Sequence, residues 1–121
     1  MASVRATLQA VAKRLTPVTD TPDLEAEIFL THHTGWTKAQ LLLHLDDDFN
    51  GLALDTFVER RLNHEPVAYI LGVWEFYSLE LTVAPPLLVP RPETEHLVEI
   101  ALAHIVAGKS RVLDLCTGTG C

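Results

Sequence analysis

Apolar residues recur at helical spacing through the first 72 residues of the chain. From Ser3, a residue type that favours the helix N-cap, to Leu15 they fall three or four positions apart and predict an amphipathic helix. Thr21-Pro22 predicts the start of a second helix, which Gly35 would end. The residues expected on the inner faces of these two helices are Val4, Leu8, Val11, Ala12 and Leu15, then Leu24, Ile28 and Phe29.

Three further helices are predicted before residue 72. Thr37 and Gln40 have the spacing of a capping box and precede an apolar run. A loop at 46–51 leads to a helix with helical spacing of its apolar positions, and Pro66 begins a brief helix that stops at Gly72. Five short helices imply a small bundle. The expected inner residues here are Leu41, Leu42, Leu43 and Leu45, then Leu54, Phe57, Val58, Arg61 and Leu62.

The pattern changes at Val73. Residues 73–84 are rich in strand-forming types with a break near Ser78, and they predict an antiparallel hairpin. Prolines make 85–92 an extended connector. Glu93 to about Val106 is predicted to be a helix ended by Gly108, and Val112–Leu115 a buried strand. The helix is expected to turn Leu97, Val98, Ala101, Leu102 and Ile105 inward.

Composition narrows the possible functions. The formal net charge of −7 argues against sequence-independent nucleic-acid binding, which needs clustered basic residues. No apolar run approaches the roughly 18 residues of a membrane span. The two cysteines, Cys116 and Cys121, do not form a secreted disulfide framework, and we expect a reducing, cytoplasmic location. The first 19 residues are basic without acids, so a mitochondrial presequence is the minor alternative.

The segment after the expected strand at 112–115 has the chemistry of a cofactor loop. Its glycines, Gly118 and Gly120, would let the backbone turn and approach a nucleotide-type ligand. Asp114, two residues before the loop, and the preceding helix and hairpin favour S-adenosylmethionine over nicotinamide or flavin cofactors. A structural turn is the alternative.

Two other segments carry weaker signals. In Pro90-Arg91-Pro92-Glu93, two prolines would hold the arginine in a stiff geometry, where its guanidinium can bind a carboxylate. A simple helix start is the alternative interpretation. Residues 46–51 imitate half of a calcium loop, but Phe57 stands where the bidentate carboxylate is needed, and the six histidines lack metal-ligand spacing. We therefore predict no metal site.

Four motifs in order resemble the PrmC/HemK family, the protein-(glutamine-N5) methyltransferases of peptide chain release factors. The match is close over residues 60–121. The motifs are Arg60-Arg61-Leu62-x-x-Glu65-Pro66-Val67-Ala68-Tyr69-Ile70-x-Gly72, Trp74-Glu75-Phe76-Tyr77, Val89-Pro90-Arg91-Pro92-Glu93-Thr94-Glu95 and Val112-Leu113-Asp114-Leu115-x-Thr117-Gly118-Thr119-Gly120.

The resemblance implies a mainly α N-terminal helical bundle that recognises the substrate (1–72), a β-hairpin linker (73–84) and the truncated start, helix plus first strand, of a Rossmann-like α/β methyltransferase domain (85–121). The implied cofactor is S-adenosylmethionine, and the acceptor is the glutamine of the release factor Gly-Gly-Gln motif. The enzyme is expected to be a monomer of the bacterial cytoplasm. It would act on release factors and bind neither membrane nor nucleic acid directly.

The resemblance also implies the site residues. The implied cofactor-binding residues are Asp114, Cys116, Thr117, Gly118, Thr119 and Gly120. The residues implied near the active site are Leu88, Pro90, Arg91, Pro92 and Glu93. No catalytic residue is assigned, because the family's Asn-Pro-Pro-Tyr loop lies beyond this chain and Ala84-Pro85-Pro86-Leu87 lacks its asparagine and aromatic. The family usually has glycine at position 116, so a positive φ at Cys116 would put the loop shape in doubt.

Three functional hypotheses follow. The first is the N-terminal part of a methyltransferase, inactive on its own. The second is an isolated helical module that binds or folds without catalysis. The third, disfavoured by motif order, is a nicotinamide-dependent oxidoreductase.

Overall fold

The computed structural model describes residues 1–105, 107–108 and 110–120. Within them the chain divides into two compact units, Met1–Leu71 and Gly72–Cys121. We call these unit 1 and unit 2 and describe each by itself.

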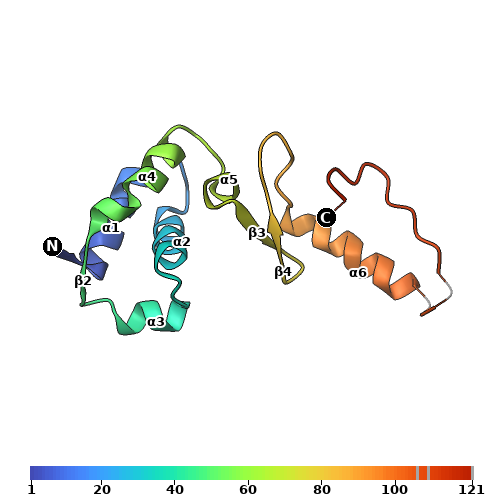
Figure 1. Ribbon diagram of the computed structural model, residues 1–121, viewed down its shortest axis with the longest axis horizontal. Coiled ribbons are helices and arrows are strands. Elements are labelled where there is room, and N and C mark those ends of the chain that lie inside the picture. The colour runs from blue at the N-terminus through green and yellow to red at the C-terminus, as the bar shows by residue number, and fades with distance from the viewer. Residues whose placement is uncertain (106, 109, 121) are drawn as a thin grey trace. The chain divides into compact units, whose positions relative to one another are not determined.

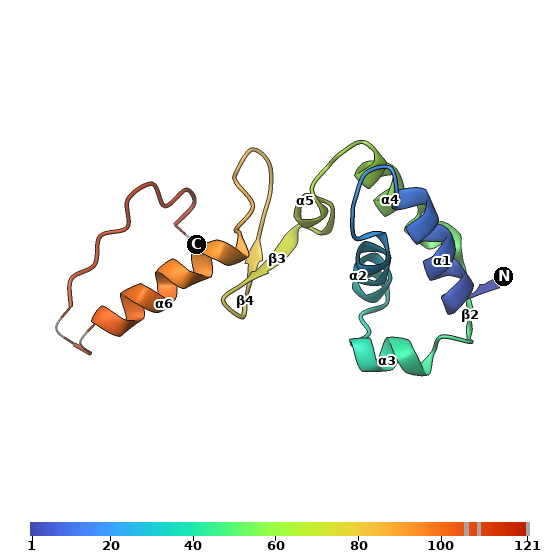
Figure 2. The same ribbon diagram turned by 180° about the vertical axis from the view of Figure 1, so that it is seen from behind.

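Unit 1 is a small helical bundle. Helix α1 packs against α2 and α4, and α5 packs against α2 and α4; Figures 1 and 2 show α1, α2 and α4 side by side from opposite directions. The predicted bundle is therefore confirmed. Its described helices are α1 (Val4–Leu15), α2 (Pro22–Thr34), α3 (Lys38–Leu43), the 3-10 helix η1 (Gly51–Leu54), α4 (Asp55–Leu62) and α5 (Val67–Leu71).

The predicted helix ends of unit 1 follow from specific caps. The Ser3 hydroxyl accepts from the backbone N–H of Ala6, and the Thr37–Gln40 capping box is fully formed. Gly35 ends α2 in the left-handed region, with φ of 74°. Thr21 precedes Pro22 as expected but makes no side-chain capping bond.

The loop at 46–51 contains an element that the sequence pattern did not predict. Strand β2 (Asp48–Phe49) pairs antiparallel with β1 (Ala2–Ser3). Backbone N–H groups of Val4 and Arg5 then donate to carbonyl oxygens of Asp47 and Leu45. This loop therefore satisfies donors that the first turn of a helix leaves without intrahelical partners.

The core of unit 1 corrects the predicted faces of two helices. In α2, Leu24 is 52% exposed, whereas Phe29 is buried as expected and Glu25 is buried as well. Glu25 can be buried because Arg61 pairs with it. Of the leucine run after Thr37, Leu41 is buried while Leu42 and Leu43 are exposed. The buried hydrophobic core is Val4, Val11, Ala12, Leu15, Ala26, Phe29, Leu30, Leu41, Leu54, Val58 and Ile70.

Unit 2 begins with the predicted hairpin. Strand β3 (Val73–Phe76) pairs antiparallel with β4 (Leu79–Thr82). Tyr77 and Ser78 have φ of 49° and 62°, the left-handed conformation that tight two-residue hairpin turns require. The predicted extended connector 85–92 is wrong at both ends, because a turn occupies 85–87 and the 3-10 helix η2 (Pro92–Thr94) begins at the last residue.

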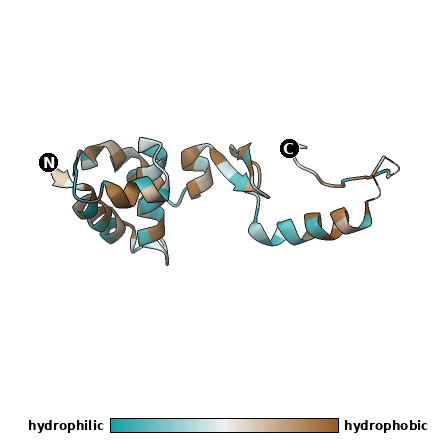
Figure 3. Ribbon diagram, turned by 90° about the horizontal axis from the view of Figure 1, so that it is seen from below, coloured by the Kyte–Doolittle hydropathy of each residue, from teal (hydrophilic) through white to brown (hydrophobic). Residues whose placement is uncertain are grey.

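Helix α6 (Glu95–His104) starts two residues later than predicted. The prediction that one side of it faces inward is wrong, because no α6 residue is buried and Leu97 is 65% exposed. Brown and teal alternate along it in Figure 3. The predicted buried strand 112–115 is also wrong, since these residues are exposed and irregular. A parallel strand needs paired neighbours, and the described residues supply none. The expected helix end at Val106 lies outside the described residues, as does Cys121.

Candidate functional site

The expected cofactor loop forms a series of left-handed turns. Cys116, Gly118 and Gly120 have φ of 60°, 67° and 78°, and the N–H of Gly120 donates to the carbonyl of Thr117 over 3.3 Å. A Cβ built on Gly118 or Gly120 would meet nothing within 4 Å. The backbone face of both glycines is therefore open, as close approach of a ligand requires.

Cys116 departs from what the loop prefers. A positive φ costs an L-residue with a Cβ roughly 1–2 kcal/mol, and glycine avoids this cost. The positive φ at Cys116 is therefore the departure from the family's loop shape that a residue other than glycine at this position could cause. The open glycines fit a ligand, whereas the exposed Asp114 lacks the strand that would fix its position. Residues 114–120 thus form an exposed loop with two open glycines.

The proline-bounded segment lies on the surface of unit 2. Leu88 is exposed, Pro90 is half-buried, and Arg91 forms an exposed ion pair with Glu93 over 3.5 Å. Pro92 begins η2, and the N–H of Thr94 donates to the Arg91 carbonyl. Arg91 is thus the N-cap of a helical turn, which the helix-start interpretation expects.

A residue without an assigned role ties two elements of unit 2 together. The Glu95 carboxylate accepts a hydrogen bond of 2.7 Å from the backbone N–H of Tyr77, in the hairpin turn. The sequence places Glu95 three residues after Pro92, at the start of a predicted helix, but nothing in the pattern indicates a bond to a turn 18 residues earlier. Among described residues, no recorded hydrogen bond or ion pair joins 88–93 to 114–120.

The Arg60–Glu65 motif has a structural role in unit 1. Arg60 binds the Glu65 carboxylate in a bidentate fork, with contacts of 2.6 and 3.0 Å. The hydrogen bond from Arg60 lowers the pKa of the Glu65 carboxyl, and the same bond raises the pKa of the Arg60 guanidinium. Arg61 binds Glu25 of α2 and the carbonyls of Val18 and Glu65. Arg60 also donates to the carbonyl of Ile70 in α5 over 3.5 Å, so the two arginines hold residues 65–70 against the bundle.

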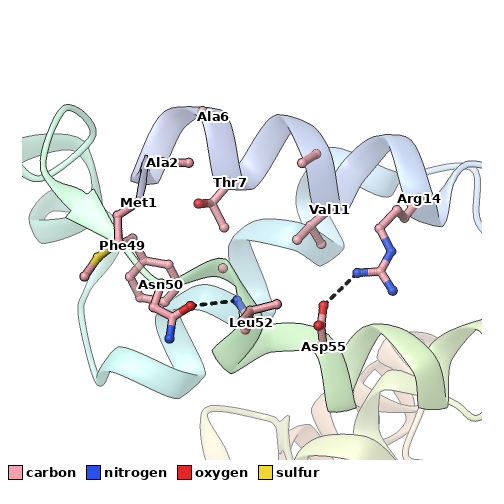
Figure 4. A pocket seen from close by; sticks show the side chains of 12 residues that line it. Met1, Ala2, Ala6, Thr7, Val11, Arg14, Phe49, Asn50, Leu52 and Asp55 are labelled. Carbon is pink, nitrogen blue, oxygen red and sulfur yellow. Dashed lines mark hydrogen bonds and ion pairs between the residues drawn. The ribbon is translucent and has the colours of Figure 1, made fainter.

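Unit 1 also has a surface hollow of about 330 Å³ between α1, β2 and η1. Figure 4 shows Thr7 and Val11 of α1 directed toward Asn50 and Leu52, with Met1 and Phe49 at one end. Arg14 and Asp55 form an ion pair of 2.8 Å at the other end. The sequence pattern gave no sign of this hollow, because the strand pairing that closes it was not predicted.

The described residues contain neither a cluster of metal-ligating side chains nor a membrane-spanning helix. No group of three or more His, Cys, Asp or Glu side chains there could hold an ion. Likewise, none of the helices in the described part of the chain is long and apolar enough to cross a bilayer.

Sequence comparisons provide independent information about family. The family described as PrmC N-terminal domain matches residues 6–72. A protein of Neisseria gonorrhoeae named release factor glutamine methyltransferase is 48% identical over 103 residues, covering 82% of this chain and 37% of that protein. Proteins of the same name from Coxiella burnetii and Escherichia coli are 41% and 44% identical, covering 99% and 84% of this chain.

The chain spans less than half the length of these relatives, with 45% of the Coxiella burnetii protein and 38% of the Escherichia coli protein covered.

Proposed function

The chain belongs to the PrmC N-terminal domain family, and on this basis we propose that the complete protein is a release factor glutamine methyltransferase. It would transfer a methyl group from S-adenosylmethionine to the glutamine N5 of the Gly-Gly-Gln motif. The observation that carries this proposal is 40–48% identity, over most of the chain, to proteins with that name.

The proposed division of the chain follows from the two kinds of structure. Residues 1–72, the helical part, would bind the protein substrate, and the hairpin at 73–84 would be a linker. Residues 85–121 would begin a Rossmann-like methyltransferase domain. The exposed apolar residues Leu97 and Ile100 of α6 support this assignment, because the helices of such a domain pack apolar side chains against a sheet.

The proposed cofactor residues are those of the glycine loop. Backbone N–H groups of 116–120 would bind the methionine end of S-adenosylmethionine, and Asp114 would support the loop. The positive φ values of Gly118 and Gly120, which let the backbone turn tightly, are consistent with this assignment. The bound cofactor supplies an electrophilic methyl group. Residues 88–93 would border the cofactor or glutamine pocket in the complete enzyme.

The partners follow from the same proposal. The protein substrate is a peptide chain release factor, and the enzyme would act as a monomer in the bacterial cytoplasm without binding nucleic acid or membrane. An amide nitrogen is a poor nucleophile, so the enzyme must orient the glutamine in line with the methyl group. None of the described residues is assigned that catalytic role.

Mass spectrometry of the methylated product tests the function. The complete enzyme, incubated with S-adenosylmethionine and a purified release factor, should add one methyl group to the peptide that contains Gly-Gly-Gln. A factor with this glutamine replaced by alanine is the control and should gain none. Methylation of both factors, or of neither, would contradict the proposal.

For the 121-residue chain alone, we propose no methyl transfer and at most weak cofactor binding. Segment 112–115 is exposed and irregular, so no strand fixes the position of the loop that follows it. Calorimetry at millimolar S-adenosylmethionine should give little heat, and micromolar affinity would contradict this. The alternative function, a helical module without catalysis, is favoured if the complete protein also fails to bind the cofactor.

A further inference from the structure

The turn of the β3–β4 hairpin binds a side chain from α6. The register of the hairpin leaves Tyr77 and Ser78 as the two residues of this turn. The backbone N–H of Tyr77 donates to Oε1 of Glu95 over 2.7 Å. Because the acceptor is a carboxylate, this is a charge-assisted hydrogen bond, which is shorter and stronger than a bond between neutral groups. The bond therefore attaches the first residue of α6 to the turn of the hairpin.

Glu95 differs from the next carboxylate on the same helix. Glu95 is half-buried, whereas Glu99, one helical turn later, is exposed and pairs with exposed His96 over 3.6 Å. The positive end of the helix dipole also favours a negative charge at the first residue of α6. A carboxylate at position 95 thus has two separate effects, one from its charge and one from the hydrogen bond that its length allows.

The bond closes a loop of chain between the hairpin and α6. At the open end of the hairpin, the N–H of Val83 donates to the carbonyl of Gly72 over 3.0 Å. Segment 84–94 leaves this end and returns to the hairpin where α6 begins, as Figures 1 and 2 show. Hydrogen bonds from the N–H groups of Leu87 and Thr94 each span three residues, so they shape turns and do not attach the segment to the hairpin. The carboxylate bond to the hairpin turn therefore holds the far end of this segment.

We propose that Glu95 is a positioning residue of the complete enzyme, and that its bond to Tyr77 holds segment 88–93 in place beside the pocket. The proposal rests on the proposed function, which assigns 88–93 to the border of that pocket. Pro90 and Pro92 each fix φ, so the segment is stiff and a displacement of Glu95 would move it as a whole. A displacement of about 1 Å can misalign the glutamine with the methyl group and lower the rate by as much as about 100-fold.

Glu95→Ala in the complete enzyme tests the proposal, with intact release factor and a short Gly-Gly-Gln peptide as substrates. The variant should lower kcat about tenfold on both substrates, because both present the same glutamine to the pocket. It should leave KM for the intact factor unchanged, since contacts remote from the glutamine determine that value. Glu99→Ala removes the exposed carboxylate of α6 and is the matched control, with kcat and KM unchanged. An equal loss of kcat in both variants would overturn the proposal.

Two further variants separate the hydrogen bond from the charge. Glu95→Gln keeps an acceptor oxygen at the same reach without the charge, so kcat should stay within about twofold of the unmodified enzyme. Glu95→Asp keeps the charge at the start of α6 but is one methylene shorter, so it should lose the bond and lower kcat about fivefold. A role for the charge alone reverses this order. Only a higher kcat for Glu95→Gln than for Glu95→Asp supports the proposal.

The outcomes distinguish a positioning role from a structural one and from the proposed function. If Glu95→Ala lowers Tm but keeps full kcat well below that temperature, the bond is purely structural and the positioning proposal is wrong, while the proposed function stands. If Glu95→Ala does not fold, the order of kcat in Glu95→Gln and Glu95→Asp decides. If the unmodified enzyme methylates neither substrate, the proposed function is wrong and the positioning proposal falls with it.

Discussion

Glu25 and Arg61 form an ion pair that is largely enclosed by unit 1. Their side chains are 10% and 16% exposed, and both carboxylate oxygens of Glu25 accept from the guanidinium, over 3.0 and 3.3 Å. Two more Arg61 N–H groups donate to the backbone carbonyls of Glu65 and Val18. The charge can be buried here because it is paired with an opposite charge and hydrogen-bonded.

Glu25→Gln should lower the free energy of unfolding by about 2 kcal/mol, because Arg61 would stay enclosed without an opposite charge. Urea denaturation of the 121-residue chain at neutral pH measures this. Glu27→Gln is the matched control: Glu27 pairs with Lys38, which is 73% exposed, over 3.4 Å, so the loss should be under about 0.5 kcal/mol. Equal losses in the two variants would contradict the role given to Arg61.

The glycine loop makes a second residue-scale prediction. In the complete enzyme, Gly118→Val should raise the Kd for S-adenosylmethionine at least about tenfold, because a β-branched residue strongly disfavours a positive φ. Gly108→Val is the control, since Gly108 has φ of 73° outside the loop and the change should cost stability alone. Calorimetric titration gives both values. An unchanged Kd for Gly118→Val would remove the loop from the cofactor site.

Single residues also mark what sequence could not supply. Position 116 was recognised as a departure from the family, but only the backbone shows that Cys116 adopts the left-handed conformation. The burial of Glu25 depends on Arg61, 36 residues away. Helical periodicity predicts burial from the polarity of each residue, so it cannot predict that a charged residue is buried through an ion pair with a residue far away in the sequence.

Among the elements, helix ends were predictable and long-range pairings were not. Ser3, Gly35 and the Thr37–Gln40 box act through bonds of three or four residues' span, which a local pattern contains. The β1–β2 pairing joins residues more than 40 positions apart, in strands of two residues each. Segment 112–115 was predicted to be a strand from its apolar composition and is irregular, because a strand also needs a neighbouring strand to pair with.

The caps give a prediction at this scale. Thr37→Ala removes one hydroxyl that accepts from the Gln40 N–H over 3.2 Å and breaks the capping box of α3, so it should destabilise unit 1 by about 1 kcal/mol. Thr21→Ala is the comparison, because Thr21 precedes α2 without a capping bond. Thermal melts of the chain should show a lower Tm for Thr37→Ala alone. A larger loss for Thr21→Ala would show that the caps are assigned wrongly.

At the scale of the molecule, the two units carry different parts of the proposed activity. Unit 1 has a buried core, an arginine network and the hollow beside Thr7. Unit 2 holds the hairpin, α6 and the glycine loop, and α6 buries none of its apolar residues. A tripeptide motif offers little surface with which to identify one protein among many, so selectivity requires contacts remote from the glutamine. We propose that unit 1 provides these contacts.

The direct test compares the KM of the complete enzyme for intact release factor and for a short Gly-Gly-Gln peptide, with and without residues 1–72. We predict that the deletion raises KM for the intact factor at least about tenfold, because remote binding contacts are lost. It should leave the peptide kinetics and S-adenosylmethionine binding unchanged. An equal loss of activity on both substrates would show that the helical part stabilises the enzyme and does not recognise its substrate.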